Sequence, residues 1–188
     1  MEDLLLESLN AAERKFAADY LDESKECLFS GIEGLSAEQL NFRAGPSEWS
    51  IAECIEHLSI AGDFGWQWMQ GALGQPIDPG KKNGSWLSDG QVIQAMTDRT
   101  KKFKTLKMLE PVSPSPDSRS MLENFSSRRE SVIAYVLTTK DNLKDRWVTH
   151  PLVGTIDLYQ LLILEAAHSA RHVAQIGAIK ANLDFPKQ

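Results

Sequence analysis

Three of the four histidines in this chain could hold one metal ion. His168 and His172 are spaced i, i+4 in a stretch with helical periodicity, so both side chains lie on one helix face, about 6 Å apart. A third imidazole, from His57 in another predicted helix, completes a set of three nitrogen ligands that leaves coordination positions open for water or substrate. The residue types and their spacing therefore predict a metal site built from His57, His168 and His172.

The polar block around His168 and His172 has two interpretations. The inward face of this last predicted helix is apolar at both ends and polar over its middle two turns. Burial of an unpaired imidazole costs on the order of a few kcal/mol, so the block needs a compensating partner. A metal ion is one such partner, and an internal hydrogen-bond network is another. Zn²⁺, Ni²⁺ and Fe²⁺ all accept imidazole, so the ligand type leaves the identity of the metal open.

Glu165 is the candidate catalytic residue. It lies three residues before His168 on the same helix face, where it could orient a ligand histidine or accept a proton beside the metal. The alternative is a solvated acid at the rim of the site. Glu53 is explained completely by a helix-capping role. His150, which precedes a proline, is expected in an exposed loop and not as a fourth ligand.

Other reactive side chains have structural explanations. Arg99, Arg128 and Arg129 lie near the inward faces of two predicted helices and could receive an anionic substrate group. Arginine stems also commonly cover apolar surface while the charged head stays in water, and this second interpretation is favoured. Cys27 and Cys54 are predicted to be buried free thiols.

Helical periodicity dominates the chain, and no stretch shows the sustained alternation that strands produce. The predicted helices are residues 2–30, 50–71, 88–110, 120–139 and 156–181, with a short turn at 36–39. Thr155 is the expected N-cap of the last helix, and Asn182 is expected to end it in the left-handed conformation. These elements predict a single all-α domain, residues 1–188, folded as a four-helix bundle. The long connection at 72–87 could cross the bundle, which allows an up-down-down-up arrangement.

Charge and hydropathy exclude several classes of function. The net charge of −6 argues against nucleic acid as a main partner, because phosphate binding needs a basic surface. The N-terminal residues 1–7 are acidic where a signal peptide is basic. No uncharged apolar run reaches the length of a membrane helix. We therefore expect a cytoplasmic protein that acts on a small molecule, away from membranes.

Two segments carry a pattern that is more specific than composition. In residues 46–58, Trp-Ser opens a helix and His57 follows the serine by seven residues. In residues 150–176, a His-Pro turn precedes a His-x-x-x-His motif that is followed by Gln-Ile. Together these segments are similar to the DinB-like superfamily, and their spacing extends the resemblance over essentially the whole chain.

The resemblance implies that His57, His168 and His172 bind a divalent metal ion in a four-helix bundle of up-down-down-up topology. Members include S-transferases and isomerases that use a low-molecular-weight thiol, and metal-dependent hydrolases. The resulting hypothesis is a metal-dependent transferase or hydrolase. The alternative is a non-catalytic bundle whose histidines are structural or bind a small ligand.

A homodimer is also expected. Members of the superfamily often pair through helix faces, and Leu4, Leu5 and Leu21 lie outside the main apolar stripe of the first predicted helix. Large apolar side chains left exposed usually mark an interface, and two-fold pairs are the commonest oligomers.

Overall fold

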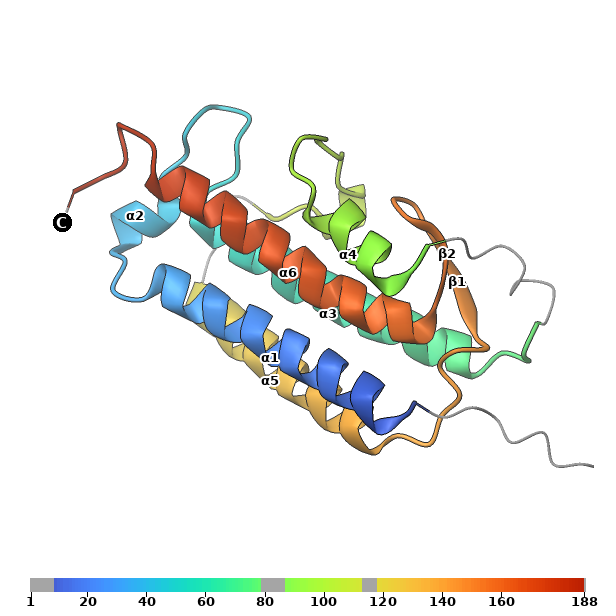
Figure 1. Ribbon diagram of the computed structural model, residues 1–188. Coiled ribbons are helices and arrows are strands. Elements are labelled where there is room, and N and C mark those ends of the chain that lie inside the picture. The colour runs from blue at the N-terminus through green and yellow to red at the C-terminus, as the bar shows by residue number, and fades with distance from the viewer. Residues whose placement is uncertain (1–8, 79–86, 113–117, 188) are drawn as a thin grey trace, which may run out of the picture.

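The computed structural model describes residues 9–78, 87–112 and 118–187 (Figure 1). The four long helices are α1 (Ala11–Ile32), α3 (Ile51–Leu73), α5 (Ser118–Thr138) and α6 (Leu158–Lys180). The smaller elements are helix α2 (Ala37–Asn41), helix α4 (Asp89–Thr97), the 3₁₀ helix η2 (Lys107–Leu109) and the strands β1 (Trp147–His150) and β2 (Gly154–Asp157).

The long helices form a bundle in which α1 and α3 each pack against both α5 and α6. In Figure 1, α1 and α6 run in one direction and α3 and α5 run in the opposite direction. The neighbours α3 and α5 are therefore parallel, which requires the long crossover that carries α4 and η2. The predicted all-α four-helix bundle with up-down-down-up topology is confirmed.

The bundle core consists of two apolar clusters with polar side chains between them. Leu21, Val132 and Leu161 belong to the cluster at the hairpin end, and Leu28 and Ile176 belong to the cluster at the α2 end. Buried polar side chains lie at the level between the clusters, among them Ser24, His57, Arg129, Ser169 and His172. The histidine site therefore lies where the apolar core is interrupted.

Helix α3, which carries His57, begins where the sequence predicts. The Ser50 backbone N–H donates to Glu53 Oε2 over 2.8 Å, and the Glu53 N–H donates to Ser50 Oγ over 3.2 Å. This reciprocal capping box confirms the predicted role of Glu53, which also forms an ion pair with Arg43. Helix α1 has the same kind of cap at Asn10 and begins at Ala11; the predicted beginning at residue 2 lies outside the described residues.

The predicted helix at 88–110 is wrong beyond Thr97, where α4 ends. The Asp98 carboxylate accepts hydrogen bonds from the backbone N–H and the hydroxyl of Thr100, at 2.9 and 2.6 Å. Such local side-chain bonds compete with helical hydrogen bonds and favour a turn. The chain then continues without regular structure to η2, and Phe103 and Leu106 are exposed instead of facing inward.

A short β-hairpin precedes α6, in contrast to the prediction of no strand. β1 and β2 pair antiparallel, with His150 opposite Gly154, and Gly154 has a φ of 75°, a conformation that favours glycine. Each strand has four residues, with Val148 and Ile156 buried opposite each other. Strands this short give too few alternations to be recognised from the sequence.

The ends of α6 differ from the predicted ends. Asp157, and not Thr155, is the N-cap, because its carboxylate accepts the Gln160 N–H at 2.7 Å. At the other end, Ala181 is the C-cap in a right-handed conformation. No described residue other than glycine has a positive φ, so the predicted left-handed Asn182 is wrong.

The environment of the two cysteines was predicted in part. Both are free thiols, as expected, but only Cys54 is buried and Cys27 is exposed. Among the described residues, no helix combines the length and the hydropathy needed to cross a membrane.

Candidate metal centre

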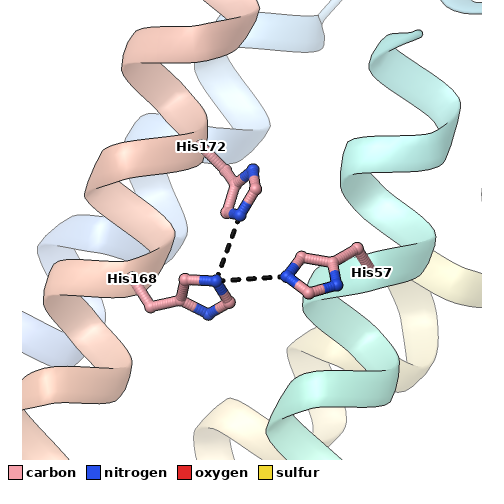
Figure 2. A group of neighbouring side chains, drawn as sticks. All are labelled: His57, His168 and His172. Carbon is pink, nitrogen blue, oxygen red and sulfur yellow. Dashed lines mark hydrogen bonds between the residues drawn. The ribbon is translucent and has the colours of Figure 1, made fainter. Parts of the chain in front are cut away.

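The structure brings His57, His168 and His172 together between α3 and α6 (Figure 2). His168 Nε2 lies 3.2 Å from His57 Nε2 and 3.1 Å from His172 Nε2. One ring nitrogen from each residue lies within 4.8 Å of the other two. His57 and His172 are buried and His168 is partly buried. All three histidines selected from the sequence therefore share one site.

Local structure explains the convergence. His168 and His172 are one helical turn apart, so they project from the same face of α6. α3 runs antiparallel to α6 and presents His57 to that face. The ring of Trp49, just before the α3 cap, lies 4.9 Å from the His57 ring and is stacked 6.1 Å from the His172 ring. The tryptophan thus covers one side of the histidine group with apolar surface.

The orientation of His57 is fixed by a backbone carbonyl. Its Nδ1–H donates to the Leu109 carbonyl oxygen of η2 over 2.8 Å. This bond places the ring proton on Nδ1, so Nε2 of the neutral ring faces the other histidines as a bare acceptor. Ligand histidines in metal sites typically make this kind of bond through their second nitrogen. No pattern of residue types indicates this bond in advance, because a carbonyl acceptor can come from any residue.

Burial keeps the three imidazoles neutral. It lowers the pKa of His57, although the Leu109 hydrogen bond opposes the shift. It also lowers the pKa values of His168 and His172 well below the ordinary value; the other histidines reinforce the effect. Neutral imidazole is the form that binds metal.

Neutral imidazoles alone do not satisfy this geometry. His168 Nε2 faces two Nε2 atoms but carries at most one proton, and the His57 Nε2 carries none. Whichever tautomers His168 and His172 adopt, at least one of the two contacts therefore brings two lone pairs or two N–H groups together, or must share the single proton of the other contact. A cation accepts all three lone pairs at once.

The spacing of the nitrogens fits a metal ion. Two imidazole nitrogens bound about 2.1 Å from one ion at angles of about 90–110° are separated by about 3.0–3.4 Å. The two observed separations, 3.1 and 3.2 Å, fall in this range. The residues present therefore match the donor type and spacing of a three-histidine site.

The structure places Glu165 away from the three nitrogens. Its carboxylate lies against Gly65 of α3, where a Cβ atom would be only 2.1 Å from Glu165 Oε1. It does not belong to the group of converging ligand atoms. Burial raises the Glu165 pKa to about 7, while Arg129 and Arg128 oppose the increase. The carboxylate is therefore not beside the three nitrogens in this arrangement, and the catalytic role of Glu165 stays a prediction.

His150 is a half-buried residue at the end of β1, so its predicted exposed loop position is wrong. Its Nδ1 accepts the Leu152 N–H over 3.2 Å, and its ring stacks 6.1 Å from the Trp68 ring. Burial lowers the pKa of His150 to about 4. It does not join the three-histidine group.

The three candidate arginines each have partners within the protein. Arg129 is buried and donates to Ser169 Oγ over 2.7 Å. Arg128 forms an ion pair with Asp63 at 2.8 Å. Arg99 donates to the Arg171 carbonyl over 3.2 Å. These contacts give the arginines structural partners, but the buried head of Arg129 differs from the expectation that the charged heads stay in water.

A cavity of about 470 Å³ lies between the end of α3 and β1. Trp68, Trp147 and Arg146 are among its lining residues, and none of the three converging histidines lines it. This cavity is therefore separate from the histidine group.

Comparison with known proteins agrees with the fold and the sequence pattern. The model of the DinB superfamily matches residues 20–176. The uncharacterized protein YuaE of Bacillus subtilis is 25% identical over 165 residues, which span 87% of this chain and 96% of YuaE. YfiT from Bacillus subtilis, described as a probable metal-dependent hydrolase with an unusual four-helix bundle topology, is similar in structure with a TM-score of 0.64. The two structures share 18% sequence identity over 96% of this chain and 93% of YfiT. Because the family model matches well over half of this chain, the chain belongs to the DinB superfamily.

Proposed function

We propose that this protein binds one divalent metal ion through His57, His168 and His172 and is a metal-dependent enzyme acting on a small molecule. The observation that carries the proposal is the convergence of three Nε2 atoms from buried or partly buried histidines, two pairs of which are 3.1 and 3.2 Å apart. The reaction class is hydrolysis or transfer to a low-molecular-weight thiol. The histidines leave the choice among Zn²⁺, Ni²⁺ and Fe²⁺ open.

The bound ion would keep its full charge among neutral imidazoles and would lower the pKa of a water or thiol that it binds. The protein's own residues have distinct roles. His57 is held by Leu109, and Trp49 keeps water from one side of the group. Glu165, with a pKa of about 7, can hold or release a proton near neutral pH. We assign it the role of proton acceptor, reached by rotation of its side chain away from Gly65.

The description of YfiT favours hydrolysis within this proposal, because that protein is described as a probable metal-dependent hydrolase. At 18% identity the likeness concerns the fold. The transferase alternative rests on the resemblance of the sequence motifs to thiol-using members of the superfamily.

A purely structural metal site is the second candidate. The histidines lie at the level between the two apolar clusters, so an ion there would link α3 to α6. In that case, chelation lowers the melting temperature without loss of any activity, and the ion has no exchangeable water. A metal with an exchangeable water supports the enzyme instead.

Metal analysis tests the proposal. The protein is purified without a nickel column, and its metal content is compared with that of His57→Ala, His168→Ala and His172→Ala. We expect about one ion per chain in the wild type and a loss of at least about tenfold in metal affinity in each variant. Full metal content in all three variants would contradict the site.

A further inference from the structure

The irregular segment that follows α4 and includes η2 contacts the histidine group. We call residues 98–112 the strap. It includes Leu109, whose carbonyl accepts the His57 Nδ1–H. Because η2 is a single short turn, the position of this carbonyl depends on how the strap is attached to the bundle.

Arg171 attaches the first part of the strap to α6. Its guanidinium donates to the backbone carbonyls of Met96, Asp98 and Lys101, over 3.2 Å to Met96 and 2.8 Å to Lys101. It also lies 5.4 Å from the centre of the Phe103 ring. One side chain thus donates to three carbonyls at and just beyond the C-terminal end of α4, which matches the planar fork of arginine.

Glu56 attaches the last part of the strap to α3. It is buried, and its Oε1 accepts the Val112 N–H over 3.1 Å. Because Glu56 directly precedes His57, this contact and the Leu109 carbonyl fix the strap on the same turn of α3. The strap is therefore held at one end by the helix that carries His168 and His172, and at the other by the helix that carries His57.

We propose that Arg171 is a positioning residue of the metal centre: by holding the strap on α6, it keeps the Leu109 carbonyl on His57 Nδ1. This inference rests on the metal binding proposed above. Without Arg171, three carbonyls lose their donors and the strap is held by fewer contacts. His57 can then rotate or exchange tautomers, and its Nε2 is no longer fixed toward the other two nitrogens.

The test compares Arg171→Met with Arg128→Met. Both replacements remove a guanidinium and keep an apolar stem, but Arg128 forms its ion pair with Asp63 of α3, outside the strap. The affinity for Zn²⁺ is measured by competition with a chromophoric chelator. We expect about tenfold weaker binding in Arg171→Met, as for other groups that orient metal ligands, and a change of less than about twofold in Arg128→Met.

A second measurement separates positioning from general destabilisation. In metal-free protein, NMR follows the exchange of the His57 Nδ1–H with solvent, which we expect to be at least about tenfold faster in Arg171→Met. Melting curves show whether each variant is folded. Arg171→Lys keeps the charge but not the planar fork, so it should recover only part of the affinity.

The outcomes are distinguishable. Wild-type affinity and wild-type Nδ1–H exchange in folded Arg171→Met would overturn the positioning role, even if the protein binds metal. If the wild type binds no metal, the proposed function fails. Slow Nδ1–H exchange in the wild type and fast exchange in Arg171→Met would then still support the role of Arg171 in holding Leu109 on His57. Equal loss of affinity in Arg128→Met would also overturn it.

Discussion

Gly65 is the residue at which α3 makes room for the carboxylate of Glu165. A Cβ atom at this position would be 2.1 Å from Glu165 Oε1, whereas a Cβ atom at Gly62, one turn earlier on α3, would have no heavy atom within 4 Å. The two glycines therefore have the same helical context and different surroundings. The raised pKa of Glu165 depends on the burial that Gly65 allows.

Substitution of these glycines by alanine should have different effects on stability. Alanine is favoured over glycine inside a helix by about 0.5–1 kcal/mol, so Gly62→Ala should raise the free energy of unfolding by about that amount. Gly65→Ala should give no gain, because the Glu165 carboxylate must move. Its pKa should fall toward the ordinary value as the group reaches solvent. Urea unfolding and NMR titration of Glu165 measure both quantities; equal stabilisation by the two substitutions would contradict this account.

The buried histidines should make the metal-free protein sensitive to mild acid. Their pKa values are lowered in the folded state, so below about pH 6.5 the unfolded chain binds more protons and stability falls. Each such histidine contributes up to about 1.4 kcal/mol per pH unit. Glu165 and Asp157, whose pKa values are raised to about 7, act in the opposite direction. A comparison of wild type with His172→Asn isolates the histidine contribution, because both proteins retain Glu165 and Asp157. Urea unfolding from pH 7.5 to 5.5 measures the free energy of unfolding of each protein.

His172→Asn should become more stable relative to wild type as the pH falls, because one acid-sensitive group has been removed. Parallel curves for the two proteins over this range would show that His172 has an ordinary pKa in the folded state.

At the level of elements, the helix that carries two of the ligands depends on its first turn. Asp157 is the N-cap of α6, and its carboxylate accepts the Gln160 N–H over 2.7 Å. Burial and the nearby Asp89 raise the Asp157 pKa to about 7, although its hydrogen bond to the Gln160 N–H and the Lys144 charge oppose the shift. The Asp157 carboxylate therefore stabilises the first turn of α6 as a hydrogen-bond acceptor. Its negative charge, in contrast, destabilises the folded protein, because the group is buried.

Two substitutions at Asp157 separate these contributions. Asp157→Ala removes the acceptor and should lower the free energy of unfolding by about 1 kcal/mol at pH 5. Asp157→Asn keeps an acceptor without the charge, so it should be more stable than wild type at pH 8. The advantage should shrink as the pH falls toward 4, because folded wild-type protein then carries a protonated Asp157. Thermal unfolding across this range measures the difference; an Asn variant that is less stable at pH 8 would show that the charge itself is favourable.

The elements also show what the sequence could and could not reveal. The long helices and the three histidines were predictable, because i, i+4 spacing and capping boxes are local patterns of side chains. The helix predicted at 88–110 was too long because Phe103 and Leu106 continue the spacing of Val92 and Met96. What ends it is the turn at Asp98 and the attachment of the strap by Arg171, which lies 73 residues later. Contacts this distant, and a carbonyl acceptor such as Leu109, leave no local pattern to read.

At the scale of the whole molecule, exposed apolar side chains gather on the strap. Phe103, Leu106, Met108 and Val112 are four of the seven large apolar residues exposed among those described. Leu21, one of the leucines that suggested a dimer, is instead fully buried in the core, and Leu4 and Leu5 lie outside the described residues. We therefore assign the predicted homodimer contact to these exposed side chains of the strap.

We expect a two-fold dimer in which the strap faces meet, and hence a mass of twice 21.0 kDa by sedimentation equilibrium at micromolar concentration. Met108, which is 66% exposed, is the site to test, because Met108→Asp places a charge in the apolar face without disturbing the core. Leu183→Asp is the matched control, since Leu183 is 98% exposed and lies after the end of α6. Met108→Asp should sediment as a monomer and Leu183→Asp as a dimer. A wild-type mass near 21.0 kDa would show that the exposed strap residues do not mediate self-association.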